Sequence, residues 1–454
     1  MELRLGKRLM LLIVLVSRPT WAGAMKHTHE FRDPIHTFIS VRTDERKVID
    51  SRPFQRLRHI HQLALSYLVY PGATHKRFEH SLGVMELASK IFDVVTDLQH
   101  VYHDSVREII PDELARTYWK SVLRMAALCH DIGHLPFSHA AEKELLPEDY
   151  DHERLTKELV YSDEMESIWK SMTPPLKADD IVKLAVGPKK AAPLELNTWE
   201  TVLAEIIIGD AFGADRMDYL LRDSYHAGVS YGTFDHNRLI NTLRILPTKY
   251  EESDQPALGL EAGGLESSEG LMIARHFMYK QVYLHHIRRV YDIHLKDFLV
   301  AWLPGGRFST KLKKHLSISD VEVLSAIRKA FEDPNSERHT LARRIQCRDH
   351  FRRFYEAAPT DVEGGKLQPG KAIAEAAQKE FDPTLIRYDY IPPKAAAPIF
   401  PVLIFDGSVD SSLKRSQILA RMPEIGVDNV YCDKSIRPEA IKWRENNKKA
   451  ILGL

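Results

Sequence analysis

Three histidines and an aspartate lie within ten residues of the segment MAALCHDIGHLPFSHAAEKELL, which spans residues 125–146. They are His130, Asp131, His134 and His139. The segment opens as an apolar run, where a polar side chain costs free energy unless something pairs with it. A divalent metal ion together with an anionic substrate would pair with all four side chains. An imidazole next to a carboxylate is a mixed ligand set that suits transition metals better than calcium.

Helix geometry decides which of these side chains can act together. His130 and His134 are four residues apart and therefore share one face of a helix. Gly133 lets a second backbone approach closely, and Pro136 ends the helix before His139. A metal ion needs more than two ligands, so the rest of the set must come from other segments.

Two further ligand candidates stand at the starts of predicted helices. His80 opens the amphipathic segment in THKRFEHSLGVMEL, and Asp215 lies in the first helical turn of GDAFGADRMDYLLRDSYHAG. A lone histidine in an apolar helix is usually a core residue, but the carboxylate of Asp131 beside His130 needs a cation or several donors. These four residues, on three helices, predict one metal site.

The blocks around these residues resemble a known family. FQRLRHIHQLALSYLVYPGATHKRFEHSLGV, CHDIGHLPFSHAAE and DRMDYLLRDSYHAGV resemble the HD-domain metal-dependent phosphohydrolases, and within them the deoxynucleoside triphosphate triphosphohydrolases. The likeness runs from about Asp33 to Val300. It implies one divalent ion (Mn, Fe, Zn, Co or Mg) held by His80, His130, Asp131 and Asp215, with additional Mg on the triphosphate.

The resemblance also implies roles for residues around the metal. His134, His139 and His152 match catalytic histidines, and Glu142 stands where an acidic residue orients one of them. For His134 and His139, support of the metal ligands is the alternative.

Substrate-binding positions follow from the same resemblance. The residues that match phosphate-binding positions are Arg77, Arg216 and Arg275. Family members often have lysine where this chain has Arg216, and the two side chains contact phosphate differently. The residues that match positions around the deoxyribose, where the family distinguishes deoxyribose from ribose, are Gln62, Leu63, Tyr219, Asp223 and Tyr283. Packing between helices is an equal alternative for the two tyrosines.

The fold predicted around these residues is mainly α. Apolar residues recur at helical spacing from Pro53 to about Leu303, after a turn-and-strand segment at 31–50. Residues 267–303 are expected to form one long helix, a candidate interface. We predict three parts: an N-terminal extension at 1–30, an HD-domain catalytic core at 31–306, and a C-terminal helical and α+β region at 307–454.

The C-terminal region changes character along its length. RHTLARRIQCRDHFRRFY, residues 338–355, is expected to be a basic helix with a solvated face, or one that binds polyphosphate or nucleic acid. FPVLIFDG and NVYCD are short β-branched and aromatic runs between turn residues, which predict strands.

Composition narrows the classes of function. Lys+Arg and Asp+Glu are both 63, so the formal net charge is zero. The overall charge therefore does not attract the chain to an anionic membrane or to nucleic acid. The three cysteines lack CxxC spacing, which fits a reducing compartment. Residues 1–24 resemble a secretory signal with a short apolar core. We favour a true start near Met25 and a cytoplasmic protein, with no membrane-spanning segment.

The predicted function is metal-dependent hydrolysis of deoxynucleoside triphosphates to deoxynucleoside and tripolyphosphate. One alternative is another HD-domain nucleotidase or phosphodiesterase. The other is a catalytically weak regulator that binds nucleotide or nucleic acid. The expected partners are the dNTP substrate and further copies of the chain. An allosteric nucleotide and single-stranded nucleic acid are left open.

Overall fold

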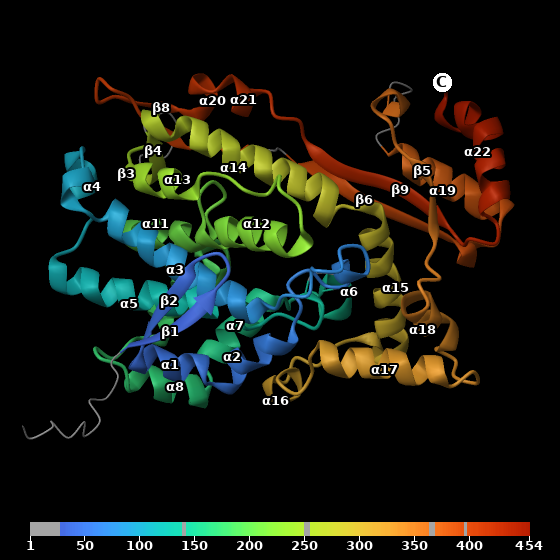
Figure 1. Cartoon of the computed structure of the whole chain (residues 1–454), viewed down its shortest axis with the longest axis horizontal. Coiled ribbons are helices and arrows are strands. Elements are labelled where there is room, and N and C mark those ends of the chain that lie inside the picture. The colour runs from blue at the N-terminus through green and yellow to red at the C-terminus, as the bar shows by residue number, and fades with distance from the viewer. Residues whose placement is uncertain (1–27, 139–141, 249–254, 363–367, 395–396) are drawn as a thin grey trace, which may run out of the picture.

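Helices dominate the computed structural model, with short strands gathered in three small sheets (Figure 1). The structure describes residues 28–138, 142–248, 255–362, 368–394 and 397–454. The prediction of a mainly α protein with an α+β C-terminal region is confirmed. None of the helices in these ranges is both long and apolar enough to cross a membrane. The signal-like segment 1–24 and the start at Met25 lie outside the described residues.

The described chain begins with a hairpin. Strand β1 (Thr28–Asp33) pairs antiparallel with β2 (Thr37–Arg42). The carboxylate of Asp33 accepts the backbone N–H groups of Ile35 and His36, both at 2.9 Å, and so closes the turn. The predicted turn-and-strand segment at 31–50 is therefore confirmed as far as Arg42, and it is wrong beyond that residue, because Thr43–Ile49 form helix α1.

Three helices form the centre of the N-terminal half: α3 (Arg77–Val95), α5 (Glu113–Cys129) and α12 (Ala214–Ala227), with α3 packed against the other two. Helix α5 begins at the surface, where the Asp112 side chain caps it by accepting the N–H of Ala115. Its second half is buried, so the chain delivers His130 and Asp131 into the core directly after the helix ends. The surrounding helices are α1 (Thr43–Ile49), α2 (Arg52–Arg56), α6 (Glu142–Leu145), α7 (His152–Val160), α8 (Asp163–Lys170), α9 (Ala178–Val186), α11 (Thr198–Ile208) and α13 (His236–Thr242).

The prediction of one long helix at 267–303 is wrong. Helix α14 (Leu265–Met278) passes into a π-helical turn, and a new helix, α15 (His286–Trp302), begins after Leu284 and His285 leave the helical conformation. The ring of His285 caps α15 by accepting the N–H of Ile287. The break contains neither glycine nor proline, so the usual sequence signals for a helix end are missing.

The basic stretch in the C-terminal region is a helix only in its first half. Helices α17 (Asp320–Glu332) and α18 (His339–Gln346) are followed by Arg348, which has a φ of 54°. Strand β5 (Arg352–Glu356) comes next, so the predicted helix over 338–355 is wrong beyond Gln346. A left-handed residue cannot continue a right-handed helix.

The remaining described strands form two sheets. The first has the order β5, β9 (Ile425–Cys432), β6 (Ile386–Lys394), and it packs with α19 (Pro369–Glu380) and α22 (Arg437–Leu452). The second has the order β3 (Leu243–Leu246), β4 (Ala257–Glu261), β7 (Pro401–Leu403), β8 (Val409–Ser411). The strands predicted in FPVLIFDG and NVYCD are confirmed, whereas β3 and β4 were not predicted. Strand β7 pairs with β4 across the predicted boundary at residue 306. The division of the chain into three parts stays a prediction.

Candidate metal centre

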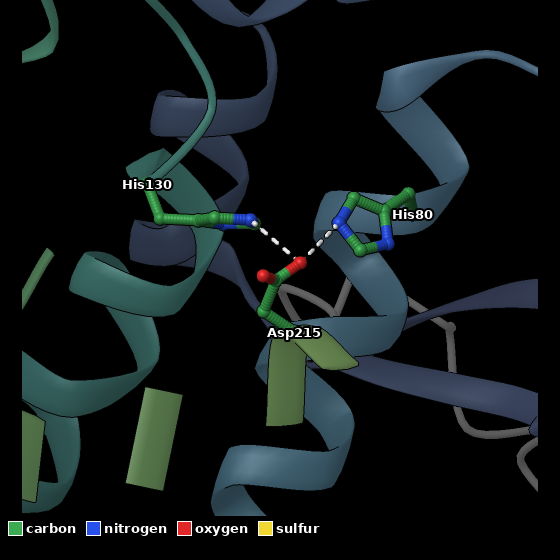
Figure 2. Close-up of side chains that lie close together, drawn as sticks. All are labelled: His80, His130 and Asp215. Carbon is green, nitrogen blue, oxygen red and sulfur yellow. Dashed lines mark hydrogen bonds and ion pairs between the residues drawn. The ribbon is translucent and has the colours of Figure 1, made fainter. Parts of the chain in front are cut away.

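Three predicted ligands converge from three helical elements. The Nε2 atom of His80, on α3, lies 3.0 Å from Oδ1 of Asp215, in the first turn of α12. The Nε2 atom of His130, which follows α5, lies 3.6 Å from the same oxygen (Figure 2). One donor atom from each residue lies within 4.8 Å of the others. This spacing allows a single ion to contact all three.

The second nitrogen of each imidazole already has a partner. Nδ1 of His80 lies 2.8 Å from a carboxylate oxygen of Asp218, and Nδ1 of His130 donates to the carbonyl oxygen of Ala127 at 2.7 Å. These contacts leave the Nε2 atoms to face the centre. In the described part of the chain, Nε2 of His130 is buried and has no hydrogen-bond partner. A cation in the centre would supply the missing partner.

Asp131, the fourth predicted ligand, lies at the edge of this group. Its carboxylate oxygens lie 3.6 Å from Nε2 of His80 and 3.4 Å from Nε2 of His130. It also forms an ion pair with Arg77, which was expected to bind phosphate, and lies 3.1 Å from Nε2 of His134. Burial raises the pKa of this carboxyl, but Arg77 and the two histidines outweigh burial and hold it well below its ordinary value.

The charges around the centre favour a cation. Burial opposes a proton on His80, but hydrogen bonds to Asp215 and Asp218 outweigh burial and raise the pKa of the imidazole to about 10. A proton therefore occupies this position when no ion does, and an ion would displace it. The linked carboxylates are Asp33, Asp131, Asp215 and Asp218, and the linked guanidinium groups are Arg77 and Arg222. If the histidines are neutral, these four carboxylates and two guanidinium groups carry a net charge of −2. A divalent ion would neutralise that charge.

A buried network that the sequence analysis missed stands behind His80. Asp218 accepts hydrogen bonds from Arg222 at 2.8 and 2.9 Å, and lies 2.8 Å from both His80 and His36. Arg222 also donates to Asp33 in the hairpin turn. Asp218 follows Asp215 by three residues and precedes Arg222 by four, so helical spacing placed a carboxylate and its cation on one face. That spacing was the available signal.

A second cluster adjoins the first. The rings of His134 and His152 stack with centroids 4.0 Å apart, and Nδ1 of His152 lies 2.7 Å from Oε1 of Glu142. Burial lowers the pKa of His134 well below its ordinary value. Burial also opposes protonation of His152, but Glu142 outweighs it and raises that pKa. Opposite shifts on neighbouring rings suit one proton acceptor and one donor. His139 lies outside the described residues.

Gly133 permits the close approach of α7 to this cluster. A Cβ atom at this position would overlap the carbonyl oxygen of His152 and the backbone nitrogen of Thr156. Gly133→Ala is therefore expected to push α7 away, separate the stacked rings, and lower kcat about tenfold, since small misplacements of catalytic groups are costly. Thermal denaturation and steady-state kinetics measure both effects.

Gly270→Ala is the matched control for this variant. Gly270 lies within α14, and among the described residues its added Cβ would meet Phe234 alone, at an ordinary contact distance of 3.9 Å. It should leave kcat unchanged and keep or raise stability, because alanine is the better helix former. Equal kinetics for the two variants would contradict the close-approach argument.

Comparison with known proteins identifies the scaffold. Residues 77–186 match the HD domain model and residues 234–382 match the HD associated region. A crystal structure of a hypothetical protein from Aquifex aeolicus is 30% identical, with a TM-score of 0.74, over 91% of this chain and 99% of that one. The chain belongs to the HD-domain family. His80 and the His130–Asp131 pair lie inside the HD-domain match, whereas Asp215 lies between the two matched ranges.

Curated relatives of this HD-domain chain are similar over part of their length. An uncharacterized protein of Methanocaldococcus jannaschii is 34% identical over 298 residues, covering 65% of this chain and 54% of that protein. The uncharacterized protein YwfO of Bacillus subtilis is 34% identical over 279 residues, 61% of this chain and 56% of that one. Deoxynucleoside triphosphate triphosphohydrolase SAMHD1 of Mus musculus is 28% identical over 415 residues, 79% of this chain and 61% of that one. The chain thus spans little more than half of these relatives.

Most predicted sugar-binding residues of this HD-domain chain gather at one place. The hydroxyl group of Tyr283 donates to Asp223 at 2.7 Å, and the ring of Tyr219 meets that of Tyr283 edge to face at 5.9 Å. His75, which the sequence analysis missed, holds the other oxygen of Asp223 at 2.7 Å. The N–H of Gln62 donates to the carbonyl oxygen of His75, which places Gln62 beside this group.

The remaining predicted substrate residues have other contacts. Leu63 is buried in the hydrophobic core. Arg216 donates to the carbonyl oxygen of Gly209 and to the exposed carboxylate of Asp210, at 3.2 and 3.3 Å. Arg275 lies over the ring of Tyr279, 5.6 Å from its centroid. Their roles toward a substrate stay predictions.

Proposed function

We propose that this chain hydrolyses deoxynucleoside triphosphates to the deoxynucleoside and inorganic tripolyphosphate. The observation that carries the proposal is the convergence of His80, His130 and Asp215, with the Nε2 atoms of both histidines directed at the same carboxylate oxygen. Similarity to a mammalian deoxynucleoside triphosphate triphosphohydrolase supports the substrate class. These three residues and Asp131 would hold one divalent ion, whose identity among Mn, Fe, Zn, Co and Mg is left open.

Different residues of the site would have different roles in the reaction. When bound, the ion would supply Lewis acidity at the α-phosphate. Arg77, Arg216 and Arg275 would balance the negative charge of the triphosphate. His152, whose Nδ1 lies 2.7 Å from Glu142, would transfer a proton to the 5′-oxygen of the departing deoxynucleoside. We include His134 and His139 in the same proton-transfer group.

The sugar group would select deoxyribose. Asp223 is fixed by both His75 and Tyr283, so its carboxylate is held ready to accept a hydrogen bond from a 3′-hydroxyl. The edge-to-face rings of Tyr219 and Tyr283 form a rigid wall that would exclude a 2′-hydroxyl. Gln62 and Leu63 are proposed to complete this pocket. Homo-oligomers and a cytoplasmic location stay predictions, and an allosteric nucleotide stays open.

Product analysis tests the proposed reaction. Purified protein with Mn²⁺ is incubated with each of the four dNTPs and the matching ribonucleotides, and phosphorus NMR follows the phosphate products. We expect tripolyphosphate from dNTPs, much less from ribonucleotides, and none after chelation of the metal. Orthophosphate or pyrophosphate would instead indicate another nucleotidase. No turnover, with binding of nucleotide or single-stranded nucleic acid, would indicate the regulator.

A further inference from the structure

The loop after His134 has an unusual backbone. Phe137 and Ser138 have φ angles of 57° and 56°, and neither is glycine. Side chains other than glycine seldom adopt this left-handed region, and two in succession persist only when the surroundings hold them. Ser138 immediately precedes the predicted catalytic His139 in the sequence. What holds this loop therefore bears on the geometry of the site.

A carboxylate from the C-terminal region holds it. Asp320, the first residue of α17, is 1% exposed. One oxygen accepts the N–H of Phe137 at 2.7 Å, and the other accepts the N–H of His61 at 2.8 Å and lies 2.6 Å from Nδ1 of the same histidine. Asp320 lies 183 residues after Phe137 and 259 residues after His61 in the sequence. One side chain thus joins two loops that flank the site.

Neighbouring contacts reinforce the same connection. Arg56 donates to the carbonyl oxygens of Ile318 and His134, both at 2.8 Å, so the segment before α17 is tied to the start of the loop as well. The rings of His61 and Phe137 are stacked, with centroids 6.1 Å apart and planes 8° apart.

Helix capping does not account for Asp320. The N-cap of α17 is Ser319, whose side chain accepts the N–H of Val321. In the described part of the chain, the Asp320 carboxylate forms its hydrogen bonds with His61 and Phe137 rather than with its own helix. The carboxylate is therefore placed to serve the loops.

We propose that Asp320 is a positioning residue that fixes the loop of residues 135–138 and, through it, the alignment of His134 with Asp131 and His152. Among the described residues, its carboxylate forms no hydrogen bond or ion pair with the predicted metal ligands or with the arginines expected to bind phosphate. A residue of the C-terminal region would thereby affect kcat through the loop, without contacting the substrate itself. The kinetic part of this inference rests on the proposed function, whereas the structural part does not.

Three full-length variants test the inference: Asp320→Ala, Asp320→Asn and the control Ser319→Ala. Ser319→Ala weakens the start of α17 without removing a contact to either loop. We expect Asp320→Ala to lower kcat about 10- to 100-fold, with KM and metal content within threefold of the wild type. Asp320→Asn keeps an oxygen that can accept from Phe137, so it should recover part of kcat. Ser319→Ala should keep wild-type kcat.

Hydrogen–deuterium exchange of the peptide containing Phe137 gives a readout that needs no turnover. It should quicken at least tenfold in Asp320→Ala and stay near wild type in Ser319→Ala. If Asp320→Ala matches Ser319→Ala in exchange and in kcat, or if its loss follows loss of metal, the inference is overturned. If the wild type releases no tripolyphosphate, the proposed function fails, and the exchange result alone decides whether Asp320 holds the loop.

Discussion

Asp215→Asn is expected to remove bound metal and to lower kcat by about 1,000-fold, since Lewis-acid stabilisation of a phosphoryl transition state is worth several kcal/mol. Asp215 is the group toward which both Nε2 atoms point, so its charge would balance the ion and its oxygen would complete the ligand set. An asparagine has the same shape but lacks the charge. Metal content after dialysis and tripolyphosphate release measure the two effects.

Asp93→Asn is the control for the loss of a carboxylate. Asp93 lies on α3, the helix that carries His80, but its side chain is 60% exposed and pairs with Lys120 at the surface. Exposed pairs contribute little, so metal content and kcat should remain at wild-type values. An Asp215→Asn protein that keeps both its metal and its activity would contradict the assigned ligand set.

Asp218→Asn is expected to weaken metal binding about 10- to 100-fold, as is usual when the carboxylate behind a metal-bound histidine is replaced. It should also destabilise the fold by about 3–5 kcal/mol, because Arg222 loses a buried partner. Asp218 is fully buried and fixes Nδ1 of His80, so the amide would weaken the preference for an Nε2 atom facing the ion. Metal titration and urea unfolding measure the two effects.

A second buried ion pair separates these effects. Asp292, on α15, is 2% exposed and pairs with Arg288 and Arg289 at 3.2 and 3.3 Å. Asp292→Asn should therefore cost comparable stability while leaving metal affinity intact. If the two variants bind metal equally well, Asp218 has only a structural role.

The candidate metal site could be predicted because two of its residues, His130 and Asp131, are polar side chains within an apolar segment. Both stand at the end of an apolar helix, where burial without a partner made them conspicuous. Asp215 stood out only by its place in the first turn of a predicted helix. Their convergence depended on the fold, which the family resemblance implied. The structure brings His80, His130 and Asp215 together, with Asp131 at the edge.

Other features leave no such trace in the sequence. Asp320 is a single carboxylate in a helical stretch, and its partners lie 183 and 259 residues away in the sequence, so only tertiary structure shows what it contacts. The break at Leu284 and His285 depends on a side-chain cap rather than on proline or glycine. Strand β4 pairs with β7, which lies far along the chain. Its own residues therefore gave only a weak signal for a strand.

The proposed reaction requires one ion bound between three helical elements. A crystal grown with Mn²⁺ and measured for anomalous scattering near the manganese edge tests this directly. We expect one strong peak about 2.0–2.3 Å from Nε2 of His80, Nε2 of His130 and a carboxylate oxygen of Asp215. A peak among His134, Glu142 and His152 instead, or no peak beside His80, would contradict the central claim.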